Sequence, residues 1–174
     1  LRVRGTGDAR APFFTNEDEK RLLFELSQMS NQNHLRLTKL ALATGFRRSE
    51  LLSLTWRNID QKKKLLYIYR KNCAAIDNSS GLRLVPLPGK AKKILEELQG
   101  RDGKVIELSK GAARNGFDKA RKKAGLETLR FHDLRHIAIS RMWSSGMNAL
   151  EISACSGHRD IKMLMRYSHF QLSK

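Results

Sequence analysis

Cysteine, acidic side chains and long apolar runs are all scarce in this sequence. The two cysteines, Cys73 and Cys155, are too few for a disulfide framework, which favours an intracellular, reduced setting over a secreted one. No apolar run approaches the roughly 20 residues of a membrane-spanning helix, so no membrane partner is expected. Internal repeats and low-complexity tracts are lacking as well.

The residues that are present suit one globular domain with a strong positive charge. The 174 residues are 40% hydrophobic, and 34 Lys and Arg stand against 17 Asp and Glu, for a formal net charge of +17. Ten of the basic residues lie between positions 36 and 71, beside only two acidic ones. Such a field attracts polyanions, so nucleic acid is the expected partner. Charge alone is also compatible with a generic basic surface.

Capping and turn residues divide the chain into helices around one pair of strands. Thr15 with Asp18 is typical of a helix start and Gly45 of a helix end, and Ser49 is expected to cap a helix at 50–54. Turn-rich residues separate two expected strands, 65–70 and 82–87. Further helices are expected at 34–44, 89–98, 110–124, 132–144, 149–156 and 161–167. The predicted fold class is mainly α with a small antiparallel β-sheet.

The segment from His132 to His136 holds the first candidate chemistry. At the start of a helix, His132, Arg135 and His136 would share one face. The Arg135 fork could bind a phosphate with an imidazole beside it. The alternatives are a zinc pair, with Cys155 and His158 as further ligands, or ordinary structural histidines.

Two further segments offer a cation and a nucleophile. Arg47 follows Gly45 at a corner between helices, where Glu50 could orient it or cap its own helix. Arg47 and Arg48 could equally be solvated surface cations. The Tyr167 phenol needs neighbouring cations or a base to attack, since its ordinary pKa is about 10. Its alternative role is packing with a bonded hydroxyl.

Taken in order, these motifs resemble the tyrosine recombinase (phage integrase) family. The order is Thr-Gly-x-Arg-x-x-Glu-Leu, a strand pair, His-x-Leu-Arg-His, then Gly-His and a Tyr nine residues after that His. The resemblance extends from about Thr15 to His169, and 131–167 resembles especially the shufflon or invertase-type integrases. Each motif alone is weak, whereas the ordered set is specific.

The resemblance implies a phosphate site and a supporting carboxylate. Arg47 and Arg135 would hold the nonbridging oxygens of the scissile phosphate, and His158 would donate to the same phosphate. Glu50 would support the arginines and His132. The family needs no metal, ATP or other cofactor, so none is expected here.

The resemblance also implies a covalent mechanism. Tyr167 would attack to give a 3′-phosphotyrosyl link, and His132 would assist proton transfer. The family's general acid is a lysine between two strands, for which Lys71 is the nearest match. Arg70 precedes it and the loop 72–81 is longer than the usual tight turn, so Lys71 could instead be a solvated hairpin charge.

The domain plan and the partners follow from the resemblance too. Residues 1–12, with two Gly, one Pro and three Arg, would be a basic linker to a missing N-terminal DNA-binding domain, and 13–174 the catalytic domain. The expected partners are double-stranded DNA and sister protomers in a synaptic tetramer. Alone, this chain is expected to be monomeric and to bind DNA weakly with steep salt dependence. The expected setting is the cytoplasm, at the nucleoid, of a bacterial or phage system.

DNA contacts outside the phosphate site are assigned to basic residues near the motifs and on the expected helix 110–124. The alternative for that helix is an ordinary solvated face. The assigned residues are Arg48, Arg70, Arg114, Lys119, Arg121 and Lys122.

Three other functions compete with recombination. A type IB topoisomerase would share the covalent intermediate, but tends to carry lysine where this chain has His158. A DNA-binding module without chemistry is disfavoured by the intact motif set. A zinc-dependent nuclease built on His132, His136 and His158 is disfavoured by the few acidic residues nearby.

Overall fold

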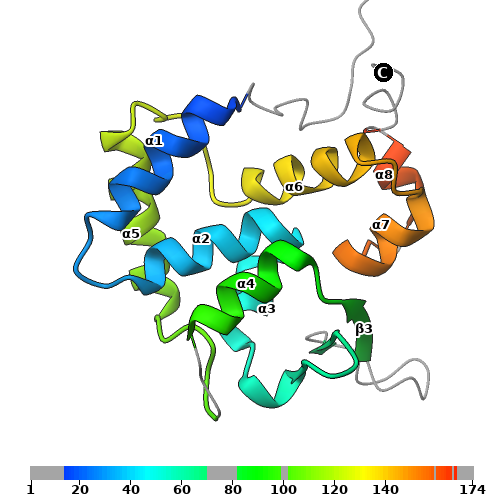
Figure 1. Ribbon diagram of the computed structural model, residues 1–174. Helices are drawn as coiled ribbons and strands as arrows, with labels where there is room; N and C mark the ends of the chain where they lie inside the picture. The colour runs from blue at the N-terminus through cyan, green and yellow to red at the C-terminus, as the bar shows by residue number, and fades with distance from the viewer. Residues whose placement is uncertain (1–13, 70–81, 99–101, 159, 166, 168–174) are drawn as a thin grey trace, which may run out of the picture.

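Helices dominate the parts of the chain that the computed structural model describes, which are residues 14–69, 82–98, 102–158, 160–165 and 167 (Figure 1). The helices are α1 Asn16–Ser27, α2 Asn33–Thr44, α3 Arg48–Ser53, α4 Gly89–Leu98, α5 Lys110–Lys123, α6 Asp133–Ser144, α7 Ala149–Ser156 and α8 Lys162–Met165. The strands are β1 Ile59–Asp60, β2 Leu65–Tyr69 and β3 Leu82–Pro86, joined in one antiparallel sheet of order β1-β2-β3. The predicted fold class is confirmed.

Local capping explains where the first helices begin and end. The Thr15 side chain accepts from the Asp18 backbone, and the Asp18 carboxylate accepts in return from the Thr15 N–H at 2.9 Å. Gly45 ends α2 with φ 66°, a left-handed conformation that suits glycine. The prediction that Ser49 caps α3 was wrong. Arg47 is the N-cap, because its N–H donates to the Glu50 carboxylate at 2.8 Å.

The strand pair follows its prediction, with one strand missed. Leu65 pairs with Pro86 and Tyr69 with Leu82, which leaves Pro86 on the outer strand. The missed strand is β1, whose two residues pair with Leu65 and Leu66. A strand of two residues is too short to show an alternating pattern in the sequence. It can therefore be recognised only from its pairing with β2.

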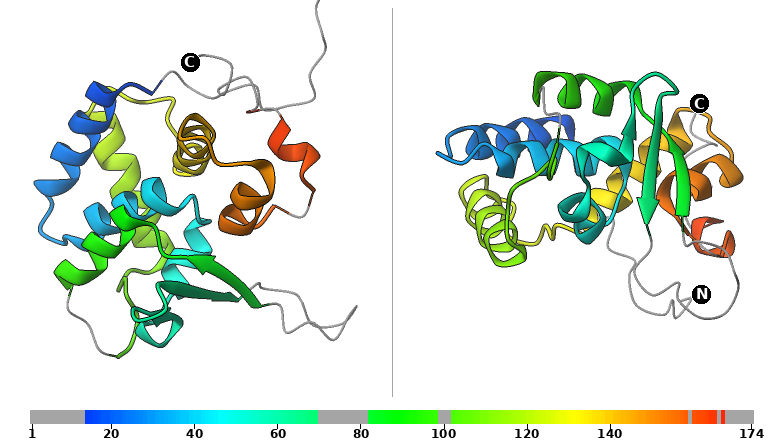
Figure 2. Two further views of the ribbon diagram at one scale, coloured as in Figure 1. Left: turned by 45° about the vertical axis from the view of Figure 1, so that its right-hand side comes forward. Right: turned by 90° about the horizontal axis from the view of Figure 1, so that it is seen from below.

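Two apolar clusters hold the helices around the centre of the molecule. The larger cluster contains residues of the helices α1 through α5 and of the sheet. Within it, Leu22, Leu40 and Leu51 are almost fully buried. The smaller one ties α7 and α8 to α6 and includes Trp143 and Tyr167. In both views of Figure 2, α1 and α5 lie on one side of α6, and α7 and α8 lie on the other. The C-terminal ends of α2 and α7 therefore lie beside the N-terminal turn of α6.

Candidate active site

Arg135 stands where three helices meet. Its side chain comes from the first turn of α6, and the residue is only 3% exposed. Its Nη1 donates to the carbonyl of Gly45 at the end of α2, at 2.6 Å, and to the carbonyl of Ser156 at the end of α7, at 2.7 Å. Its Nη2 lies 3.3 Å from the ring nitrogens of His158. One guanidinium thus joins segments that are 90 and 21 residues away.

His158 is oriented by the turn that ends α7. The Ser156 hydroxyl lies 2.7 Å from its Nδ1, and the Ser153 hydroxyl donates to its backbone carbonyl at 2.8 Å. Gly157 between them has φ 73° and closes the helix. The ring is therefore held beside Arg135 by contacts on both sides.

Arg47 and Glu50 form the other half of the site. The Glu50 carboxylate accepts from the Arg47 N–H and from its Nη1 at 3.2 Å. The Arg47 side chain is 44% exposed, whereas that of Glu50 is 9% exposed. Arg83 from β3 reaches the same carboxylate at 3.4 Å. Arg83 was not among the predicted site residues, and its only sequence signal is an inward-facing position in β3.

Burial and neighbouring charges shift the pKa values of both Arg135 and His132. Burial first, and then the Arg47 charge, lowers the pKa of Arg135 to about 10, while Glu50 and Tyr167 oppose that shift. Partial burial of the His132 ring, followed by the charges of Arg135 and Arg47, lowers the pKa of that imidazole. His132 therefore favours its neutral form near pH 7, when it can accept a proton.

Tyr167 is buried and is hydrogen-bonded to a histidine. The residue is 4% exposed, and its hydroxyl is a hydrogen-bond partner of His136 Nδ1. The ring of His132 stands edge-on to that of His136, with centroids 5.1 Å apart. His136 lies one helical turn from His132, which was the signal for a shared face, but it was not assigned a catalytic role.

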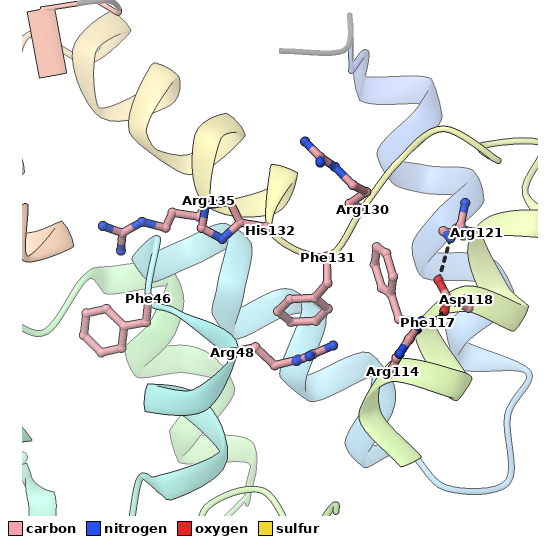
Figure 3. Close-up of a pocket in the computed structure, with 10 residues that line it drawn as sticks. All are labelled: Phe46, Arg48, Arg114, Phe117, Asp118, Arg121, Arg130, Phe131, His132 and Arg135. Atoms are coloured by element: carbon pink, nitrogen blue, oxygen red, sulfur yellow. Dashed lines mark hydrogen bonds and ion pairs between the residues drawn. The ribbon is translucent and has the colours of Figure 1, made fainter. Parts of the chain in front are cut away.

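An arginine-rich cavity of about 450 Å³ opens beside Arg135 and His132 (Figure 3). Arg48 lies 5.8 Å from the centre of the Phe131 ring, and that ring meets Phe117 edge to face at 5.1 Å. Among the described lining residues the one acid is Asp118, which pairs with Arg121 at 2.7 Å. The lining residues are Phe46, Arg48, Arg114, Phe117, Asp118, Arg121, Arg130, Phe131, His132 and Arg135.

The other predicted DNA contacts are placed differently. Lys119 and Lys122 are exposed on α5 but do not line this cavity. Arg70 and Lys71 lie outside the described residues, so the assignment of Lys71 as general acid stays a prediction.

The zinc alternative lacks a ligand cluster in the described residues. Within those ranges no three His, Cys, Asp or Glu side chains are grouped to hold a metal ion. His136 and His158 instead contact Tyr167 and Ser156.

None of the helices in the described parts is long and apolar enough to span a membrane.

The arrangement has close counterparts among known proteins. Residues 12–173 match the model of the phage integrase family. The chain belongs to this family. It is 34% identical over 163 residues to the shufflon-specific DNA recombinase of Escherichia coli, covering 90% of this chain and 40% of that protein. This member of the phage integrase family thus spans less than half the length of that relative.

Solved structures of family members share the fold. The catalytic domain of bacteriophage HP1 integrase superposes with a TM-score of 0.72 and 27% identity, covering 90% of this chain and 86% of that domain. The Tn1549 transposon integrase in complex with transposon right end DNA gives a TM-score of 0.68 at 18% identity, covering 95% of this chain and 63% of that one.

Proposed function

We propose that this chain is the catalytic domain of a site-specific DNA recombinase that cleaves and rejoins strands through a covalent 3′-phosphotyrosine. The observation that supports this best is the convergence at Arg135. Its guanidinium is bonded to the ends of α2 and α7, and its Nη2 lies 3.3 Å from the ring nitrogens of His158. In the proposal, the cations, the imidazoles and the one phenol of the motif set act together on one phosphate.

Arg47, Arg135 and His158 are the proposed phosphate ligands. Arg135 is held by two carbonyls through Nη1, which leaves Nη2 beside His158 to donate to a nonbridging oxygen. Arg47 is nearly half exposed, so its side chain can reach a second oxygen while Glu50 restrains it. Such preorganised donors stabilise the charge of the pentacoordinate transition state.

Tyr167 is the proposed nucleophile. Its Oη would form a bond to phosphorus as the bond from phosphorus to the 5′-oxygen breaks, and its proton would pass to a neighbouring imidazole, with His132 assisting. The leaving 5′-oxygen would take a proton from Lys71. The phosphotyrosine conserves the bond energy, so a 5′-hydroxyl can reverse the step without ATP or metal.

The arginine-rich cavity is proposed to receive DNA backbone phosphates next to the scissile one. Arg48 and Arg114 line it, and Arg130 at its rim is more than half exposed. Arg121 is turned toward Asp118 and the Glu127 carbonyl, so its contribution is through charge at longer range. Lys119, Lys122 and Arg70 would add contacts outside the cavity.

The proposed setting is a larger assembly on DNA. The relatives are longer than this chain, which supports residues 1–12 as a linker to a DNA-binding domain and 13–174 as the catalytic domain. Recombination would join four protomers in a synaptic tetramer, and the chain by itself would be monomeric. Relatives from phages and bacteria support action on DNA at the nucleoid in the cytoplasm of a bacterial or phage system.

A covalent-trapping experiment tests this proposal. The protein is incubated with randomised, singly nicked duplexes in EDTA, and protein-linked strands are recovered under denaturing conditions and sequenced. An adduct that survives EDTA, disappears in Tyr167→Phe and persists in Tyr69→Phe supports the phosphotyrosine. Tyr69 is a suitable control because it is a 60% exposed tyrosine on β2. An undiminished adduct in Tyr167→Phe, or none in the unaltered protein, contradicts it.

A further inference from the structure

Arg83 is a buried arginine at a strand position that usually takes an apolar side chain. Burial alternates along β3, with Arg83 and Val85 facing inward. Arg83 is opposite Ile68 of β2, which is also buried, and its own side chain is 7% exposed. Burying a guanidinium costs free energy that an apolar side chain would not cost. Packing alone therefore does not explain why a cation occupies this buried position.

The first contacts of Arg83 are with Glu50 of α3 and with Phe46, two residues before that helix. Its Nη2 lies 3.4 Å from Glu50 Oε2, the oxygen that also accepts from the Arg47 N–H. Its guanidinium carbon lies 5.2 Å from the centre of the Phe46 ring. Glu50 thus stands between two arginines, of which Arg47 is half exposed and Arg83 is buried.

Arg83 also approaches the turn that ends α7. A Cβ atom placed on Gly157 would overlap the Arg83 guanidinium, so the glycine leaves the space that Arg83 fills. Gly157 lies directly between Ser156, whose carbonyl accepts from Arg135, and His158. A left-handed φ and this close approach both require glycine at 157.

We propose that Arg83 is a positioning residue for strand cleavage, which holds the Glu50 carboxylate against Arg47 and supports the turn that carries His158. This inference rests on the proposed function. We assign Arg83 no contact with the phosphate, because its guanidinium is buried; it contacts both halves of the proposed site, at Glu50 and at the turn around Gly157. Because Arg83 belongs to β3, it also ties the hairpin that would supply Lys71 to both halves.

The test separates DNA binding from the chemical step. Arg83→Met and Arg83→Lys are compared with Arg141→Met, a control that breaks a partly buried ion pair with Glu19 between α6 and α1. Thermal unfolding, DNA affinity in a Tyr167→Phe background and the adduct rate at saturating nicked DNA are measured for each. We expect Arg83→Met to remain folded, to bind DNA within about threefold of the unaltered protein, and to form adduct at least about tenfold more slowly. The adduct rate of Arg83→Lys should lie between those of Arg83→Met and the unaltered protein. The Arg141→Met control should keep the adduct rate of the unaltered protein.

A double-mutant cycle with Glu50→Gln identifies the path of the effect. If Arg83 acts through Glu50, the two rate losses will not add, because the residues are in contact. A normal adduct rate in Arg83→Met, or a loss of rate matched by equal losses of DNA affinity and folding, overturns the proposal. If Arg83→Met does not fold, Arg83→Lys decides by the same criteria, and failure of both to fold overturns it as well.

One readout does not depend on cleavage. Arg83→Met should move the NMR signals of the His158 ring and leave those of the distant His34 ring in place, whereas unchanged His158 signals contradict the positioning role. If the unaltered protein forms no adduct, the proposed function fails. The His158 signals of Arg83→Met would still show whether Arg83 positions the turn that carries His158.

Discussion

The hydroxyl of Tyr167 and Nδ1 of His136 are hydrogen-bond partners, although 31 residues separate them in the chain. Their rings are inclined by only 28°, with centroids 6.0 Å apart. The phenol is therefore held against α6 beside an imidazole. His136, rather than His132, is the histidine that contacts the proposed nucleophile.

Replacing His136 tests that contact. His136→Phe keeps an aromatic ring but removes the hydrogen-bond partner, so we expect the adduct rate to fall by about 10²-fold, as general-base assistance is worth roughly 10²–10⁴-fold. Single-turnover adduct formation on nicked DNA measures it. His136→Gln, which keeps a polar atom, should retain more of the rate than His136→Phe. Equal rates in all three proteins would remove His136 from the mechanism.

Arg135→Lys should fail despite its unchanged charge. A lysine ammonium cannot bond both the Gly45 and Ser156 carbonyls and still donate beside His158, because it lacks the planar fork. We expect a loss of about 10²–10³-fold in adduct rate, and about 1–3 kcal/mol in the free energy of unfolding from the carbonyl left without a donor. Kinetics and thermal unfolding measure the two losses. Near-normal cleavage would show that the fork is not needed.

The control for Arg135 is Arg141→Lys, further along α6. Arg141 pairs with Glu19 through one nitrogen of a partly exposed side chain, which an ammonium can replace. We expect little change in either measurement.

The pH dependence of His132 has a definite sign. Its pKa lies below the ordinary 6.5 in the folded protein, so folding favours the neutral ring. The stability from this preference is present above pH 6.5 and is lost as the pH falls through the folded pKa. NMR titration should show the low pKa directly. Arg130→Gln should raise it, because the Arg130 charge contributes to the shift, while the pKa of His34, lowered by burial, should not move.

DNA affinity should depend on the arginines of the cavity through phosphate charge. Removing one arginine that binds a phosphate should reduce the slope of log affinity against log salt by about 0.9. Arg48→Gln and Arg114→Gln are expected to do so, because both line the cavity. Lys20→Gln is the control, since Lys20 is an exposed lysine on α1 paired with Glu17. Titrations at several salt concentrations measure the slopes. Equal slopes in all variants would show that DNA phosphates do not bind in this cavity.

Gly116 of α5 should not tolerate a side chain. A Cβ at this position would overlap the ring of buried His34 on α2, so Gly116→Ala should lower the free energy of unfolding by about 1–3 kcal/mol. Gly111→Ala in the same helix meets only the Ser109 hydroxyl, at 3.9 Å, and should stabilise by roughly 0.5–1 kcal/mol. Thermal unfolding of the two variants should give shifts of opposite sign.

Local chemistry made much of the secondary structure predictable. The Thr15 cap, the Gly45 end of α2 and the bounds of α4 depend on neighbours within a few residues, and all three were confirmed. The start of α3 was missed because Glu50 accepts from the Arg47 N–H, which makes Arg47 the residue before the helix and leaves Ser49 inside it. β1 was missed because two residues show no pattern until β2 pairs with them.

The amino-acid sequence by itself determined the fold class and the family, and through the resemblance to that family it predicted the residues assigned to the phosphate. The fold class follows from short-range capping and patterning, and the family from the order of the motifs, none of which needs coordinates. Only the tertiary structure decided that Arg83 lies buried against Glu50 and that His136 contacts Tyr167. Their contacts arise when elements far apart in the chain pack together, and no spacing rule acts over such separations.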